Sequence, residues 1–168
     1  MKTIALLAGL LVSSVSSAAL AYRPVQTADI PELVRTLERE PLAPGARKLR
    51  QDLLAWATQT RDVTVTVCDV LGPVPGSTVP YGPELLLQAM LGNAAFQLEN
   101  PASKDDEEMA QMAGITSLLR AYQATLAADP NARIPQYDTW LVELEAGRLA
   151  RDRALVIKEK CSGGPAMA

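Results

Sequence analysis

The stretch that decides the fold is LLLQAMLGNAAFQL, residues 85–98, which contains no charged side chain. Its apolar residues point in nearly every direction of a helix, and a helix that is apolar all round is normally buried. Pro83 suits the first turn of such a helix, Glu84 favours its positive end, and Pro101 prevents its continuation. The sequence therefore predicts a buried central helix over residues 84–99.

Other helices are predicted on both sides of this stretch, from start signals and apolar periodicity. Small residues at 92–95 would let one of them approach the central helix closely. The fold class that we predict is all-α, a compact bundle of five or six helices around the central helix. The flanking helices are expected at about residues 31–39, from Pro44 to about Ala57, from the acidic run after Ser103 to about Ala128, and from about Asp138 toward Cys161, with a disturbance at Gly147.

Residues 62–71 fit two different patterns. From Asp62 to Cys68 the side chains alternate with a period of two, which is typical of a strand, but apolar residues of the same stretch also have helical spacing. A lone strand needs a partner, and no other segment alternates convincingly, so we favour a helix capped by Asp62. The next stretch, 72–82, holds three prolines and three glycines and predicts a loop.

Residues 1–21 have the pattern of a secretory signal peptide, with a basic residue, an apolar stretch and small residues that end at Ala21. We predict cleavage after Ala21, because small residues at Ala19 and Ala21 are the pattern that a signal peptidase cuts. A membrane anchor is the alternative, but the apolar stretch is shorter than the roughly 20 residues that span a bilayer. One helical domain is expected over 22–161, with a flexible tail over 162–168. The mature chain is expected to be exported, either periplasmic or secreted, without a transmembrane segment.

Cys68 and Cys161 are the only two cysteines. An exported chain matures in an oxidising compartment, where an even pair favours a disulfide, and a redox pair would normally have the closer C-x-x-C spacing. We therefore predict a structural disulfide between Cys68 and Cys161 that ties the last helix to the middle of the chain.

The absence of histidine excludes several kinds of chemistry. Ser-His-Asp and Cys-His catalysis, the H-E-x-x-H zinc site and histidine-ligated haem all require that residue. Residues 72–82 lack the spacing of the two common glycine-rich phosphate loops. The net charge is −3 with no long basic run, which argues against a nucleic-acid partner. We assign no catalytic, cofactor-binding or metal residue and expect no cofactor.

Carboxylates are the remaining chemical candidates, because two acids suffice for glycoside hydrolysis. Glu84 and Glu99 would lie roughly 22 Å apart along the central helix, too far to act as partners. Asp69 with Glu84 or Asp138 remains an open pairing that nothing specific selects. The acids at 105–108 are of the type that binds calcium, but they lack the spacing of a calcium loop, so we expect a solvated helix start.

Residues 121–132, AYQATLAADPNA, resemble the end of the second helix of a tetratricopeptide repeat, a family in which a helix closing on D-P-N-A is common. The resemblance covers about a dozen residues, without a second copy at the repeat period of about 34 residues. It implies helical hairpins and a packing surface for a peptide or protein partner, and it designates no contact residue.

Three functional hypotheses follow. We favour an exported, non-catalytic interaction or structural module of the cell envelope or periplasm, with a protein or peptide partner. The alternatives are a small exported hydrolase that uses paired carboxylates and an apolar-ligand carrier with a cavity beside Met90, Met109 and Met112. An interaction module should expose an apolar patch, a carrier should enclose a cavity, and such a hydrolase should hold two acids within about 10 Å in a concave site.

Overall fold

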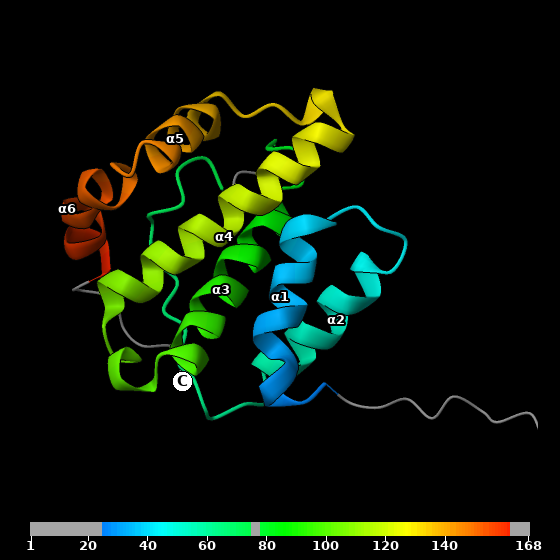
Figure 1. The fold of residues 1–168 in the computed structure, drawn as a ribbon, viewed down its shortest axis with the longest axis vertical. Coiled ribbons are helices and arrows are strands. Elements are labelled where there is room, and N and C mark those ends of the chain that lie inside the picture. Colours follow the sequence, from blue (N-terminus) through cyan, green and yellow to red (C-terminus); the bar gives the residue numbers. More distant parts are fainter. Residues whose placement is uncertain (1–24, 75–77, 162–168) are drawn as a thin grey trace, which may run out of the picture.

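Two long helices, α3 (Gly82–Glu99) and α4 (Glu107–Ala128), pack side by side through the middle of the computed structural model (Figure 1). The structure describes residues 25–74 and 78–161. Leu85 and Leu91 of α3 are almost fully buried, as are Ile115 and Leu118 of α4. The buried central helix predicted over 84–99 is confirmed, and α4 is a second helix of comparable burial beside it.

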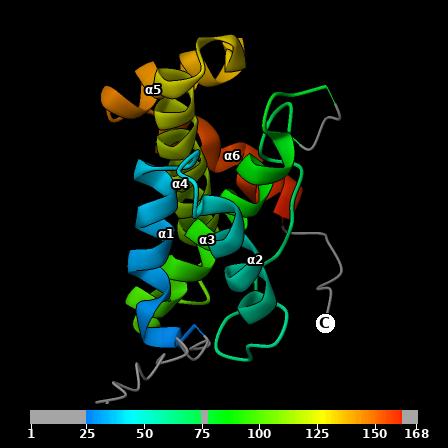
Figure 2. The ribbon, with the colours of Figure 1, turned by 90° about the vertical axis from the view of Figure 1, so that its right-hand side faces the viewer.

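Four shorter helices cover the two sides of this pair, α1 and α2 on one side and α5 and α6 on the other (Figures 1 and 2). The described residues hold six α-helices, three single turns of 3₁₀-helix and no strand, which confirms the predicted all-α class. The four covering helices are α1 (Ile30–Arg39), α2 (Ala46–Ala57), α5 (Pro135–Glu145) and α6 (Leu149–Cys161), and the 3₁₀ turns are η1 (Thr27–Asp29), η2 (Pro101–Ser103) and η3 (Pro130–Ala132).

Helix α3 contributes to two separate hydrophobic cores. Leu85 and Ala89 belong to a core shared with α4, α5 and α6, whereas Leu91 and Ala95 belong to a core shared with α1 and α2. A helix with one polar face could serve only one of these cores. The lack of charge on every side of α3 is therefore what allows it to lie between them.

The two long helices approach each other closely at two glycines. A methyl group added at Gly114 would lie 2.6 Å from the Ala89 carbonyl oxygen, and one added at Gly92 would overlap the Ser117 side chain. Only a residue without Cβ fits at either position unless the helices separate. Within the small-residue patch expected at 92–95, Gly92 and Asn93 thus pack against α4, whereas Ala95 packs in the core shared with α1 and α2 and Ala94 borders a cavity.

Several helix boundaries differ from the sequence-based expectation, among them the start of the last helical region, which lies at Pro135 rather than near Asp138. Helix α2 begins at Ala46, two residues after Pro44, and α4 begins at Glu107 because the Asp106 side chain accepts the hydrogen bond from the Met109 N–H at 3.0 Å. The single last helix is in fact two helices, α5 and α6. Gly147 has a φ of +67°, a left-handed conformation that ends the first of them.

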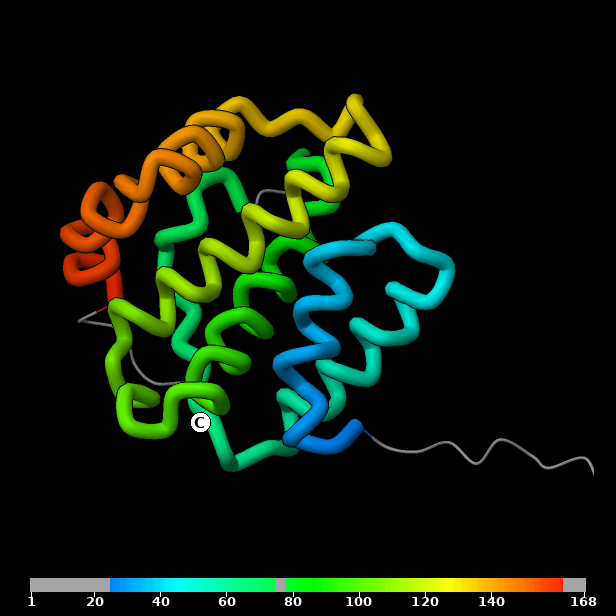
Figure 3. The backbone as a smooth tube through the Cα atoms, viewed as in Figure 1, coloured from blue at the N-terminus to red at the C-terminus, as the bar shows by residue number. Residues whose placement is uncertain are grey.

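The helix predicted over 62–71 is wrong, because these residues form neither helix nor strand. The segment runs back along α3 from its C-terminal end toward its N-terminal end (Figure 3). Its backbone is paired with side-chain amides. Thr64 donates its N–H to Gln97 Oε1 at 3.1 Å and accepts from Gln97 Nε2 at 2.7 Å, while Gln111 Nε2 donates to the Thr66 carbonyl at 2.7 Å. Two glutamines thus replace the missing strand partner.

The predicted disulfide is present and joins Cys68 to Cys161, the last residue of α6, with the two Cα atoms 5.4 Å apart. Within the expected loop over 72–82, Val74 is buried in the core, and helix α3 already begins at Gly82. The predicted signal peptide over 1–21 and the predicted tail over 162–168 lie outside the described residues. None of the described helices is long and apolar enough to cross a bilayer.

A Gly114→Ala substitution is expected to destabilise the fold by about 1 to 3 kcal/mol, because the new methyl group must push α3 and α4 apart. Gly45→Ala is the matched control, since a Cβ at Gly45 meets nothing within 4 Å. Urea denaturation monitored by far-UV circular dichroism measures both. Equal stability of the two variants would contradict the close helix approach.

A Gln97→Leu substitution should leave the N–H and the carbonyl of Thr64 without their side-chain partner, because leucine can neither donate nor accept a hydrogen bond. We expect a loss of about 1 to 3 kcal/mol and faster amide exchange at Thr64. Gln123→Leu, on the exposed side of α4, is the control. Unchanged exchange at Thr64 in Gln97→Leu would show that the amide does not hold the segment.

Replacing Cys68 and Cys161 together by serine should lower the free energy of unfolding by about 4 to 5 kcal/mol, because the bridge closes a loop of 93 residues in the unfolded chain. Denaturant unfolding of the wild type and the double variant without reductant measures the difference. Mass spectrometry of the unreduced protein is the direct check, and free thiols at both positions would refute the bridge.

Candidate functional site: a groove between α2 and α3

Helices α2 and α3 run in the same direction, and a groove follows the seam between them. One cavity of about 440 Å³ lies beside the first turns of both helices, and a second of about 660 Å³ lies beside their later turns. Leu87 lines both cavities, so they adjoin, and we describe them together as the α2–α3 groove. The α2 residues that line it, from Arg47 to Thr58, span about 16 Å at 1.5 Å per residue, or about three helical turns.

The floor of the groove is apolar. It is formed by Leu54 and Ala57 from α2 and by Leu87, Met90 and Ala94 from α3. Leu54 is 44% exposed, so its side chain is open to solvent on the groove side of α2. Helix α2 buries the face that includes Leu53, and Leu54, about 100° farther around the helix, lies outside that core.

The rim of the groove is mainly basic. Arg47 and Arg50 lie along α2, Arg61 lies near its far end, and Glu84 is the one acid among the lining residues. Neither Arg47 nor Arg61 forms an ion pair with any residue in the described ranges. This local excess of positive charge is notable because the whole chain has a net charge of −3.

Arg50 is the most constrained of these cations. Its Nη2 donates to the Pro41 carbonyl at 2.6 Å, and its Nε is buried without a hydrogen-bond partner in the part of the chain that the structure describes. Burial lowers the pKa of the Arg50 guanidinium because it disfavours the charged form, and the Glu84 carboxylate opposes this effect. Any further carboxylate placed in the groove would stabilise the charged form in the same way.

Apart from the groove, a polar pocket of about 250 Å³ lies between the 61–66 segment and the start of α4. Asp62, Asp105 and Glu107 line it together with Arg61 and Lys104. The acids expected as a solvated helix start therefore partly face a concave surface. Glu107 accepts from Gln111 at 2.7 Å, and Asp62 accepts from the hydroxyl groups of Thr27 and Thr60 at 3.2 and 3.3 Å.

The acid pairings left open by the sequence do not share a cavity among those described here. Glu84 lines the α2–α3 groove, whereas Glu99 pairs with Arg35 at 2.7 Å on the opposite side, beside α1. Asp69 is largely exposed and 4.0 Å from Lys160. Asp138 accepts from the Tyr122 hydroxyl at 2.7 Å and lies 3.2 Å from Arg133, so it is engaged within the fold.

The three methionines proposed for a carrier cavity also lie apart. Met90 lines the α2–α3 groove, but Met109 is 47% exposed on α4 and Met112 packs against the core of α4, α5 and α6. The sequence analysis missed the groove altogether. The sequence feature that could have indicated the groove is Leu54, an apolar residue outside the stripe of buried residues on its helix.

Comparison with known proteins adds no assignment: no family model matches the chain, and neither curated proteins nor solved structures give a significant match. Residues 121–132, which resemble part of a tetratricopeptide repeat, form the last turns of α4 and η3. These residues do not line the α2–α3 groove.

Proposed function

We propose that this protein is an exported, non-catalytic binding module, and that its α2–α3 groove takes an amphipathic helix with acidic flanks from a protein partner in the cell envelope or periplasm. The observation that supports the proposal is an open apolar floor about three turns long beneath a basic rim. Grooves of this kind commonly bind one apolar face of a helix through residues spaced three or four apart.

Charge supports an acidic partner over a basic or neutral one. Arg47, Arg50 and Arg61 face the groove against the single carboxylate of Glu84. Complementary charge at a rim speeds association and selects against like-charged partners, while the apolar floor supplies most of the affinity. A disulfide and the predicted signal peptide are compatible with a location outside the cytoplasm.

The groove also has the volume of a small-molecule site, so an apolar ligand is the competing occupant. The groove is open to solvent along two neighbouring helices, and this shape favours an elongated partner such as a helix over a small enclosed ligand. A fluorescent fatty acid that binds the protein and is expelled by Leu54→Glu, in the absence of any peptide binding, would support the carrier instead.

The test is a selection from a displayed library of short random peptides on the purified protein. We expect the recovered peptides to be amphipathic helices with Asp or Glu beside the apolar stripe. Fluorescence anisotropy should then show at least about tenfold weaker binding to Leu54→Glu, because a carboxylate in the floor repels both the stripe and its acidic flanks.

Leu155→Glu is the matched control, since Leu155 is 79% exposed on α6, away from the groove. The double variant Arg47→Glu, Arg61→Glu should reduce the preference for acidic over basic peptides and the salt dependence of binding. Peptides without acidic flanks, or peptides that bind Leu54→Glu as well as the wild type, would refute the proposal.

A further inference from the structure

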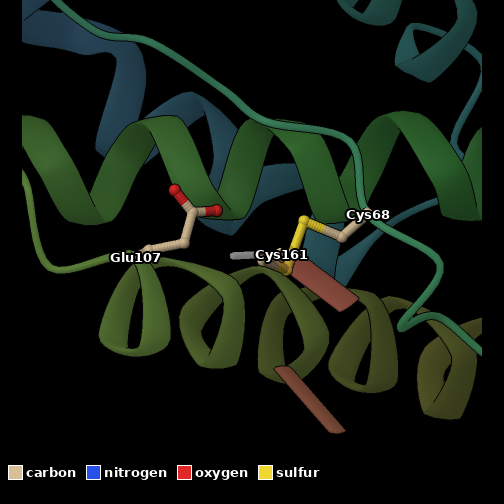
Figure 4. Close-up of side chains that lie close together, drawn as sticks. All are labelled: Cys68, Glu107 and Cys161. Atoms are coloured by element: carbon tan, nitrogen blue, oxygen red, sulfur yellow. A yellow bond between two sulfur atoms is a disulfide. The ribbon is translucent and has the colours of Figure 1, made fainter. Parts of the chain in front are cut away.

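The two sulfur atoms of the disulfide belong to a cluster of three potential metal ligands (Figure 4). The sulfur atoms of Cys68 and Cys161 and one carboxylate oxygen of Glu107 all lie within 4.8 Å of one another. This is the one such group of three or more His, Cys, Asp or Glu side chains within residues 25–74 and 78–161. The three come from distant parts of the chain: the 62–71 segment, the first turn of α4 and the end of α6.

One amide contacts two of these three groups. Gln111 Nε2 lies 2.7 Å from Glu107 Oε1 and 3.6 Å from Cys68 Sγ, and it also donates to the Thr66 carbonyl at 2.7 Å. Gln111 itself is only 5% exposed, so its position is fixed by packing. Buried hydrogen-bond donors that aim a carboxylate at a metal are the usual support of such sites.

We propose that reduction of the Cys68–Cys161 bridge converts this cluster into a binding site for Zn²⁺, with two thiolates and the Glu107 carboxylate as ligands. Two sulfurs and one oxygen suit zinc, which leaves a fourth position for water or another ligand. The oxidised bridge and the bound ion exclude each other, because a sulfur in a disulfide is not a thiolate. The site is therefore gated by redox state, independently of the α2–α3 groove.

The chemistry is ordinary thiol–disulfide exchange followed by metal binding. An external dithiol breaks the bond between the two protein sulfurs and is itself oxidised to a disulfide, which leaves thiols at Cys68 and Cys161. Zn²⁺ then displaces the two thiol protons. The sulfurs must separate to about 3.8 Å, the spacing set by two Zn–S bonds of about 2.3 Å in a tetrahedral site.

Contacts other than the bridge hold both cysteines near Glu107. The Cys68 segment is fixed by Gln111 on one side and by the buried Leu71 on the other, where the Leu71 carbonyl accepts from the Tyr137 hydroxyl at 2.6 Å. Cys161 follows Ile157, which is 1% exposed in the core. Breaking the bridge therefore leaves both thiols attached to docked segments.

The experiment uses Co²⁺ as a coloured probe and Zn²⁺ as its competitor. The purified protein is reduced with a phosphine, desalted without oxygen and titrated with Co²⁺. We expect one ion per chain with the near-ultraviolet band of cobalt–thiolate bonds, displaced by Zn²⁺, and no band in the oxidised protein. Bound Zn²⁺ should also slow re-formation of the bridge when oxidant is added, because the thiolates are occupied.

Variants distinguish a metal site that includes the Glu107 carboxylate from metal binding by two free thiols alone. Cys68→Ser and Cys161→Ser should each abolish the cobalt band, and Glu107→Gln should weaken Zn²⁺ binding at least about tenfold. Glu108→Gln is the matched control, since Glu108 is the adjacent exposed acid outside the cluster. Far-UV circular dichroism follows the helices after reduction.

Each outcome decides the proposal. A cobalt band that Glu107→Gln weakens and Glu108→Gln does not, with helices retained, supports the site. Equal Zn²⁺ affinity of Glu107→Gln and the wild type, absence of the band in the reduced protein, its presence in the oxidised protein, or loss of the helices on reduction overturns it.

Discussion

The close packing of α3 against α4 is the contact on which the rest of the structure depends. Gly92 and Gly114 bring the two helices close enough that a single methyl group would meet the partner helix. That spacing lets buried residues of α3 serve one core with α4, α5 and α6 and another with α1 and α2. Loss of the close approach would disturb both cores together, because α3 lies between them.

Buried glutamine side chains add hydrogen bonds between elements that pack through apolar contacts. Gln88 donates to the Val34 carbonyl of α1 at 3.3 Å and to the Ser117 hydroxyl of α4 at 2.9 Å. Gln97 and Gln111 form hydrogen bonds with the backbone of the segment after α2, at Thr64 and Thr66. Uncharged amides can do this inside a core at a lower desolvation cost than carboxylates or ammonium groups. The same Gln111 contacts both Glu107 and Cys68.

The groove arises from the way α2 is attached. Helix α2 buries one face in the core shared with α1 and leaves Leu54 outside it. The surface of α3 that faces Leu54 across the groove is apolar as well. Two neighbouring apolar faces that do not fully close on each other form a furrow, and the arginines of α2 place positive charge along it. The feature that makes α3 a good core helix thus also supplies half of the proposed binding surface.

Four features could be predicted from local composition or from the presence of just two cysteines. They are the all-α class, the buried helix over 84–99, a close helix contact at its small residues and the pairing of Cys68 with Cys161. The sequence could not determine the form of residues 62–71. Their partners are the side chains of Gln97 and Gln111, which approach only after α3 and α4 have packed. The groove and the Glu107 cluster likewise required the tertiary structure, since both join residues that are distant in sequence and share no local pattern.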